Sequence, residues 1–230
     1  MFANTQFPGI YRSASQVNTA MASVYGYMAL ATIVSMAVAW FVGTTPVLLQ
    51  FFFTGFVKWI VIFAPLAAIF AVHYALAKDP PKPLATAMLY GFSALMGLSF
   101  AAIFAVYKMG SIVSAFMGGA ILFGVMSFWG YFTKKSLDSW GSFLFAGLIA
   151  VVLASIVNIF LGNTVLSTVI SAIAIIVFLG LTAYDTQKIR EMVSIESSNG
   201  STEVVGALTL YLDFINIFLS LLQLFGDKKE

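Results

Sequence analysis

The sequence predicts an all-α integral membrane protein with seven transmembrane helices, and three observations support this prediction. Hydrophobic residues make up 61% of the chain and charged residues only 9%, against roughly 25% charged residues in soluble domains. Apolar runs long enough to cross a hydrocarbon core of ~30 Å recur along the chain. The connectors between the runs are too short to hold a soluble domain, so we expect residues 1–230 to form a single transmembrane domain.

The seven runs are separated by clear breaks in composition. Residues 1–19 are polar and carry one charge, Arg12, and we expect them to form a cytoplasmic amino-terminal segment that is not a cleaved signal peptide. Proline breaks the helical pattern after the first run, at Pro46, and again in the Lys78–Pro83 turn. The predicted spans are Ala20–Gly43, Val57–Ala77, Leu84–Tyr107, Ser111–Phe132, Ser142–Leu161, Val165–Arg190 and Glu203–Gly226.

Basic residues are distributed unequally between the two sides of this arrangement. The side of the amino terminus carries Arg12, Lys78, Lys82, Lys134, Lys135, Lys188 and Arg190, and the opposite side carries Lys58, Lys108, Lys228 and Lys229. Cytoplasmic loops of membrane proteins hold the excess of Lys and Arg. We therefore expect a cytoplasmic amino terminus and, because the number of spans is odd, an external carboxyl terminus.

The composition also excludes several classes of function. The chain has no cysteine and a single histidine, His73, which excludes disulfides, thiolate metal sites and paired-histidine metal motifs. The net charge is +2, and there is no basic patch interleaved with aromatic residues, so nothing indicates nucleic-acid binding. We predict that the protein has no cofactor.

The last run carries polar residues on one helical face, with an aspartate near its middle. At 100° per residue these positions fit within an arc of about 100°, and this face must contact protein or water because lipid cannot satisfy its polar groups. Asp213 is the only charge between Val204 and Gly226, and an ionisable residue at such depth is by default a functional-site hypothesis. This polar stripe consists of Gly206, Thr209, Asp213, Asn216, Ser220 and Gln223. Thr209, Asn216 and Ser220 are predicted to support the aspartate.

A second acid, Asp185, lies near the end of the sixth run. If that helix continues toward Ser197, the hairpin tip falls near Ser198–Asn199, about 13 residues after Asp185 and about 15 before Asp213, so a rise of 1.5 Å per residue places both carboxyl groups at similar height. Two carboxylates that meet in a low-dielectric site cannot both ionise comfortably, and we expect them to share a proton. Such a pair suits a proton switch, a weak Ca²⁺ site or acid/base catalysis.

Each of these residues also has a simpler interpretation. Asp185 at the membrane surface would pair with Lys188 or Arg190. Asp213 would be a hydrogen-bonded packing residue. His73, near the cytoplasmic end of the second run, is more typical of a packed histidine than of a ligand.

Two stretches around the acids resemble the Bax-inhibitor (transmembrane Bax inhibitor motif) family, in particular its bacterial members. They are Val177–Lys188, which reads VFLGLTAYDTQK, and Ala207–Phe218, which reads ALTLYLDFINIF. Weaker similarity extends over nearly the whole chain. The paired aspartate motifs are specific, whereas the rest is generic membrane sequence.

This resemblance implies a bundle in which the last helix is central and surrounded by the other six, located in a bacterial inner (plasma) membrane. It also implies a pH-sensitive calcium leak and, for eukaryotic relatives, protection from cell death. Asp185 and Asp213 would then be the pH sensor and part of the calcium path. Relatives have a basic latch near the end of the second helix. That region has no arginine here, so His73 or Lys78 would have to take this role.

Three functions follow as hypotheses. The first is a cation leak channel gated by the Asp185–Asp213 pair, in which a shared proton holds the last two spans together and its loss makes them repel. The second is an intramembrane aspartyl protease, but the glycine-rich approach and the Pro-Ala-Leu segment of presenilin-like enzymes are missing around Asp213, and we predict no enzyme. The third is a non-conducting regulator that binds a membrane protein such as a quality-control protease. Membrane lipid, protons and Ca²⁺ are the other expected partners.

Overall fold

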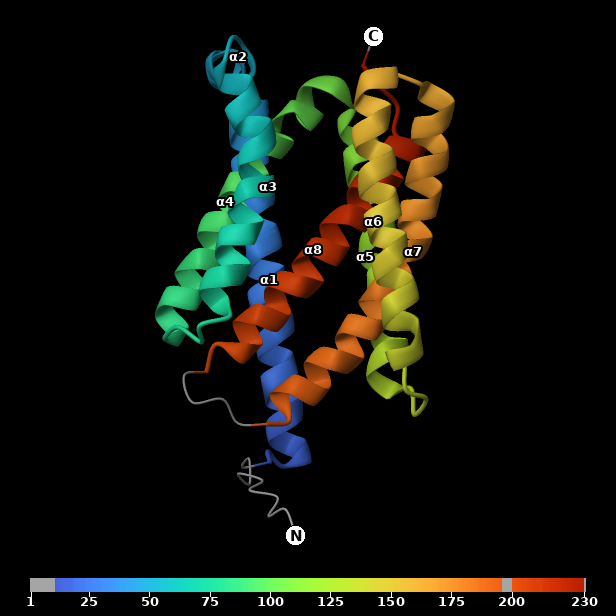
Figure 1. Cartoon of the computed structure of the whole chain (residues 1–230). Helices are drawn as coiled ribbons and strands as arrows, with labels where there is room; N and C mark the ends of the chain where they lie inside the picture. Colours follow the sequence, from blue (N-terminus) through green and yellow to red (C-terminus); the bar gives the residue numbers. More distant parts are fainter. Residues whose placement is uncertain (1–10, 196–199, 230) are drawn as a thin grey trace.

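The computed structural model describes residues 11–195 and 200–229, and seven helices in this part are long and apolar enough to cross a membrane. The all-α fold and the seven predicted spans are therefore confirmed. The long helices are α1 (Ala14–Gly43), α3 (Val57–Leu76), α4 (Lys82–Val106), α5 (Met109–Phe132), α6 (Asp138–Leu161), α7 (Thr164–Val193) and α8 (Thr202–Phe225). The first residue of α1 and the last of α8 lie at opposite ends of the bundle (Figure 1). Which end faces the cytoplasm stays a prediction.

The helices begin and end where local chemistry satisfies their backbone groups. Ser13 caps α1, because its hydroxyl accepts from the Gln16 amide while its own amide donates to the Gln16 side chain at 2.7 Å. The helix thus starts earlier than the apolar run and includes part of the predicted polar segment, of which residues 1–10 lie outside the described residues. The α7 helix likewise continues to Val193. The predicted hairpin tip at Ser198–Asn199 falls outside the described residues.

One helix was not expected from the sequence. The short α2 (Pro46–Phe53) lies in the connector between α1 and α3, where we predicted only a break. Pro46 occupies its first turn, a position that suits proline because no intrahelical hydrogen bond is required from its nitrogen. At eight residues, α2 is too short to span a bilayer.

The bundle consists of two groups of helices that α8 joins. In one group α4 packs between α1 and α3, and in the other α7 packs against α5 and α6. Figure 1 shows α8 crossing obliquely between the two groups, and it packs against α1, α4, α5 and α7. The outer span of each group lies farther from α8: α3 packs mainly on α4, and α6 packs mainly on α7.

The α8 helix forms the centre of the fold. Over the most apolar 18 residues of α8, 72% of the residues are buried, whereas the corresponding stretch of any other span is at most 33% buried. Phe214 of α8 makes edge-to-face contacts with Phe116 and Phe123 of α5, at centroid distances of 5.3 and 5.9 Å. The outer spans instead expose many large apolar side chains, as expected for helices that face lipid.

Candidate functional site

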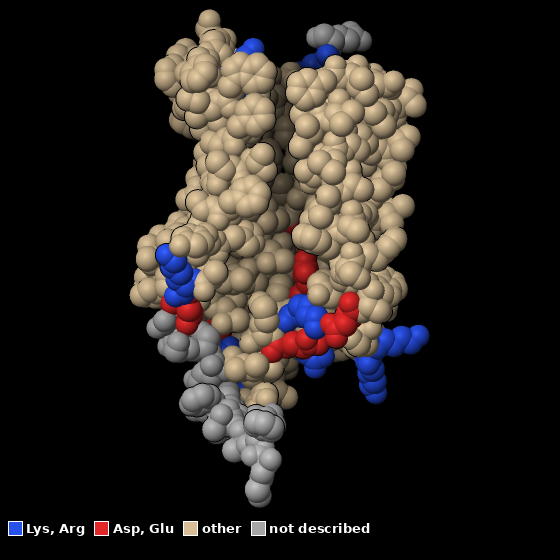
Figure 2. All heavy atoms as spheres, viewed as in Figure 1, with Lys and Arg blue, Asp and Glu red and all other residues tan. Residues whose placement is uncertain are grey.

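A groove of about 700 Å³ lies between α3 and α6, with α8 as its floor. Figure 2 shows it as a deep cleft between the two halves of the molecule, with acidic atoms visible inside its lower part. Its lining residues are His73 from α3, Gly141, Ser142, Phe145, Leu148 and Val152 from α6, Phe178, Leu181, Tyr184 and Asp185 from α7, and Thr209, Leu212, Asp213 and Asn216 from α8. The groove exists because α3 and α6 do not close over α8.

Asp185 and Asp213 meet in this groove. Asp213 is only 4% exposed and Asp185 is half-buried, and both side chains line the groove. One oxygen of Asp213, Oδ2, is buried and has no hydrogen-bond partner among the described groups. Because a carboxylate accepts hydrogen bonds but cannot donate them, the two acids could bond each other only with a proton on one of them.

Three other polar members of the stripe make ordinary hydrogen bonds. The Thr209 hydroxyl donates to the Val205 carbonyl at 3.2 Å, and the Asn216 amide donates to the Leu212 carbonyl at 2.8 Å. Gln223 bonds Ser167 of α7. A side chain at Gly206 would overlap Ile189 of α7, and Ser220 is buried. The stripe therefore faces α7 and the groove, and Asp213 stands out as the member whose polar group is left unsatisfied.

The structure brings one of the two candidate basic residues to the groove. His73 lines it, and Nδ1 of the ring lies 3.0 Å from the Ile69 carbonyl oxygen. The Lys78 ammonium lies over the Tyr74 ring, 4.3 Å from its centroid, and Lys78 is not a lining residue of the groove. His73 is therefore the better placed candidate for a latch.

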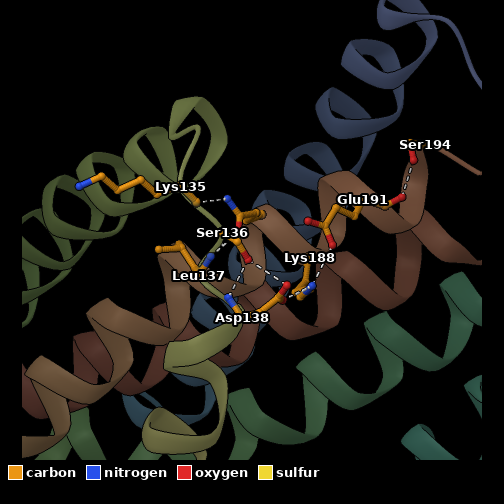
Figure 3. Close-up of polar contacts among 8 residues, drawn as sticks. Lys135, Ser136, Leu137, Asp138, Lys188, Glu191 and Ser194 are labelled. Atoms are coloured by element: carbon orange, nitrogen blue, oxygen red, sulfur yellow. Dashed lines mark hydrogen bonds and ion pairs between the residues drawn. The ribbon is translucent and has the colours of Figure 1, made fainter.

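The basic residues that follow Asp185 have other partners. Figure 3 shows Lys188 bonded to Asp138 at the start of α6 and to Glu191, the latter at 2.9 Å. Arg190 donates to the Tyr131 carbonyl at 3.0 Å and stacks on the Tyr131 ring. The simpler interpretation, in which Asp185 pairs with one of these residues at the membrane surface, therefore does not describe this structure.

The segment between α5 and α6 is fixed to α7 at the same end of the groove. The Gln187 side chain accepts from the Leu137 amide at 2.8 Å and donates to the Lys135 carbonyl at 3.0 Å. Gly141 and Ser142 follow one turn later and line the groove. These contacts set the position of the α6 wall relative to Asp185.

A buried ion pair near the α7–α8 hairpin was not anticipated. Arg12 bonds Glu203 at 2.8 Å and also the Val193 carbonyl at 3.3 Å, while its backbone amide donates to the Ser194 carbonyl at 2.8 Å. Glu203 is 5% exposed. The sequence shows an acid at the start of the last apolar run and a single charge in the amino-terminal segment. Because the two residues are 191 positions apart, no periodicity in the sequence indicates that they pair.

Fold and site together define an integral membrane protein with seven spans and a buried acid pair at the floor of a lateral groove. The family model described as "Inhibitor of apoptosis-promoting Bax1" matches residues 17–230, and the chain belongs to this Bax inhibitor family. It is 39% identical over 225 residues to the inner membrane protein YbhL of Escherichia coli, covering 96% of each chain. It is also similar to uncharacterized proteins of Rickettsia prowazekii (37% identity, 91% of this chain and 90% of the relative) and Deinococcus radiodurans (36%, 95% and 94%).

These similarities bear on location as well as on family. The match to an inner membrane protein, together with the seven apolar helices, supports an integral protein of the inner membrane. The orientation of the termini stays the prediction made from the basic residues.

Proposed function

We propose that this protein is a pH-sensitive cation leak channel, with Ca²⁺ as a permeant ion, that is gated by protonation of the Asp185–Asp213 pair. The observation that carries the proposal is the buried Oδ2 of Asp213, which lacks a hydrogen-bond partner among the described residues and lies beside a second acid. Packing alone gives no reason to keep two carboxyl groups together at this depth, because each is costly to bury there.

The shared proton controls how α7 and α8 interact. With one proton between the acids, a hydrogen bond links the two helices and the floor of the groove is closed. When the proton leaves, two negative charges face each other at low dielectric, where their repulsion is far stronger than in water. This repulsion favours separation of the helices or binding of a cation between them. Ion flux is therefore expected to rise with pH.

The groove offers Ca²⁺ a weak site. Calcium takes six to eight oxygen ligands, whereas the described residues contain no group of three or more acidic, histidine or cysteine side chains that would hold a metal ion. The two carboxylates and the oxygens of Thr209 and Asn216, which also line the groove, would need water to complete the coordination. Weak binding suits passage of an ion better than its storage.

Besides the two acids, two other side chains that line the groove can gain or lose a proton. They are His73 on α3 and Tyr184 on α7, while the lining residues of α6 carry no titratable group. A protonated His73 adds a positive charge opposite the acids, which stabilises an ionised carboxylate and assists closure across the groove. His73 is accordingly the proposed basic latch.

Calcium flux into liposomes that contain the purified protein, measured over mildly acidic to neutral pH, tests the proposal. Flux should rise with pH in the wild type and lose this dependence in Asp185→Asn and in Asp213→Asn. Asp138→Asn is the matched control, because this acid is exposed and paired with Lys188 outside the groove. Unchanged pH dependence in both groove variants would reject the gating mechanism.

The same preparation separates the channel from the other functions. On this proposal the protein is not an enzyme, and cleavage of a helical membrane substrate that is lost in Asp185→Asn would contradict it. Absence of flux from the purified protein, together with a stable complex with another membrane protein, would favour a non-conducting regulator.

A further inference from the structure

A second cavity, of about 320 Å³ and apolar, lies on another side of α8 between α1, α4 and α5. Ile215 and Phe218 of α8 form part of its wall. Two lining residues carry hydroxyl groups, Thr32 and Ser35, and both donate to carbonyl groups of their own helix at 3.0 and 3.1 Å. A cavity whose polar atoms are already bonded does not hold ordered water, so an apolar group is its natural occupant.

This cavity opens sideways, toward the surface that faces the bilayer. Its lining residues Trp40, Val113 and Met117 are each about half exposed, at 55%, 54% and 55%. The cavity runs along α1 from Trp40, in the last turn of the helix, to Thr32. Its length along the helix axis is roughly 12 Å at a rise of 1.5 Å per residue. One leaflet of a ~30 Å hydrocarbon core has a comparable depth. The space is therefore shaped and placed to receive a single acyl chain.

Basic residues gather at the end of the cavity where α4 and α8 end and α5 begins. The segment after α8 pairs with the α4–α5 turn, since the Lys229 amide donates to the Val106 carbonyl at 2.8 Å and the Lys108 amide to the Asp227 carbonyl at 3.0 Å. The Lys229 ammonium donates to the carbonyl of Phe104, a cavity-lining residue, at 2.7 Å. The charged residues described in this turn and tail are Lys108, Lys228, Lys229 and Asp227.

We propose that this cavity binds an acyl chain of an anionic phospholipid whose phosphate contacts Lys108 and Lys229. The dry walls, lateral opening and depth fit the chain, and the excess of lysine over acid fits the charge of the headgroup, which each nearby lysine attracts. Lys229 has three donor hydrogens, of which the Phe104 carbonyl uses one. The site lies apart from the aspartate pair and does not depend on the proposed channel function.

Native mass spectrometry of the full-length protein in detergent, with phosphatidylglycerol or phosphatidylcholine of identical chains, tests the headgroup contacts. The wild type should retain phosphatidylglycerol in preference to phosphatidylcholine. Lys108→Gln and Lys229→Gln should each reduce this preference about fivefold, because a lysine near an anionic surface contributes about 1 kcal/mol. Lys58→Gln is the control, since its ammonium lies over Trp59, a ring outside the cavity.

A second pair of variants tests the cavity itself. Val113→Phe fills the mouth and should lower retention of both lipids. Val125→Phe makes the same change on the same helix at a residue that is 60% exposed and outside the cavity, and it should retain lipid as the wild type does. Thermal unfolding midpoints establish that each variant is folded. Equal retention of the two lipids by the wild type, or undiminished retention by folded Val113→Phe, would overturn the proposal.

Discussion

Arg12 and Glu203 form a buried ion pair, with 2.8 Å between Nη1 and Oε1, that joins the residue before the α1 cap to the first turn of α8. Their side chains are 16% and 7% exposed. Because Arg12 also bonds the carbonyl groups of Val193 and Ser194 at the end of α7, one short segment holds both helices that carry the acid pair. The Arg12 contact thus fixes the end of the hairpin on which the site depends.

Replacement of Arg12 by Gln should strongly destabilise the protein. The change leaves the Glu203 carboxylate buried without its partner, which typically costs about 3–5 kcal/mol of the free energy of unfolding. Reversible unfolding in mixed micelles measures this loss. Lys188→Gln is the control, since its partners are exposed and such pairs contribute little. Similar small losses in both variants would show that the Arg12–Glu203 pair does not hold the hairpin.

Close contact between α5 and α7 depends on Gly130. A methyl group at this position would overlap the backbone of Ala183, so Gly130→Ala should force the helices apart and lower the free energy of unfolding by about 1–3 kcal/mol. Gly124→Ala on the same helix meets no atom within 4 Å, and it should leave stability unchanged or raise it by up to about 1 kcal/mol. The same unfolding assay distinguishes the two. A loss in Gly124→Ala as large as that in Gly130→Ala would contradict the contact.

The latch assignment predicts different behaviour for the two basic residues of the α3 end. His73→Gln removes a titratable group that lines the groove and should alter the pH profile of Ca²⁺ flux. Lys78→Gln should leave that profile unchanged, because the Lys78 ammonium lies on the Tyr74 ring. Flux measured in liposomes over the same pH range decides between them. The reverse outcome would transfer the latch to Lys78.

Much of the fold is readable from the sequence because lipid imposes strict rules on a spanning helix. Length and hydropathy fix seven spans, and the polar stripe around Asp213 identifies α8 as a helix that avoids lipid. The antiparallel hairpin then places Asp185 and Asp213 at similar height, since both distances to its tip follow from a constant rise per residue. These features depend on local periodicity, which is why they are predictable.

Contacts that depend on the packing of distant helices are not readable in the same way. The Arg12–Glu203 pair joins residues 191 positions apart, and the contacts of Lys188 with Asp138 and of Arg190 with Tyr131 depend on where α5 ends and α6 begins. The openness of the groove follows from α3 and α6 packing on α4 and α7 instead of closing over α8. No periodicity in the sequence encodes that choice, so His73 had to be located by the structure.

The central claim is that Asp185 and Asp213 share one proton, and pH-dependent infrared spectroscopy of the purified protein tests it most directly. Protonated carboxylic acids and carboxylates absorb at different infrared frequencies. In the wild type, the band of one protonated carboxylic acid should disappear over the pH range in which Ca²⁺ flux rises. Asp185→Asn and Asp213→Asn should each shift the midpoint of this loss, because each removes the partner of the remaining acid, whereas Asp138→Asn should not. If each acid titrates at the same midpoint with and without its partner, the two carboxyl groups are independent and the account is contradicted.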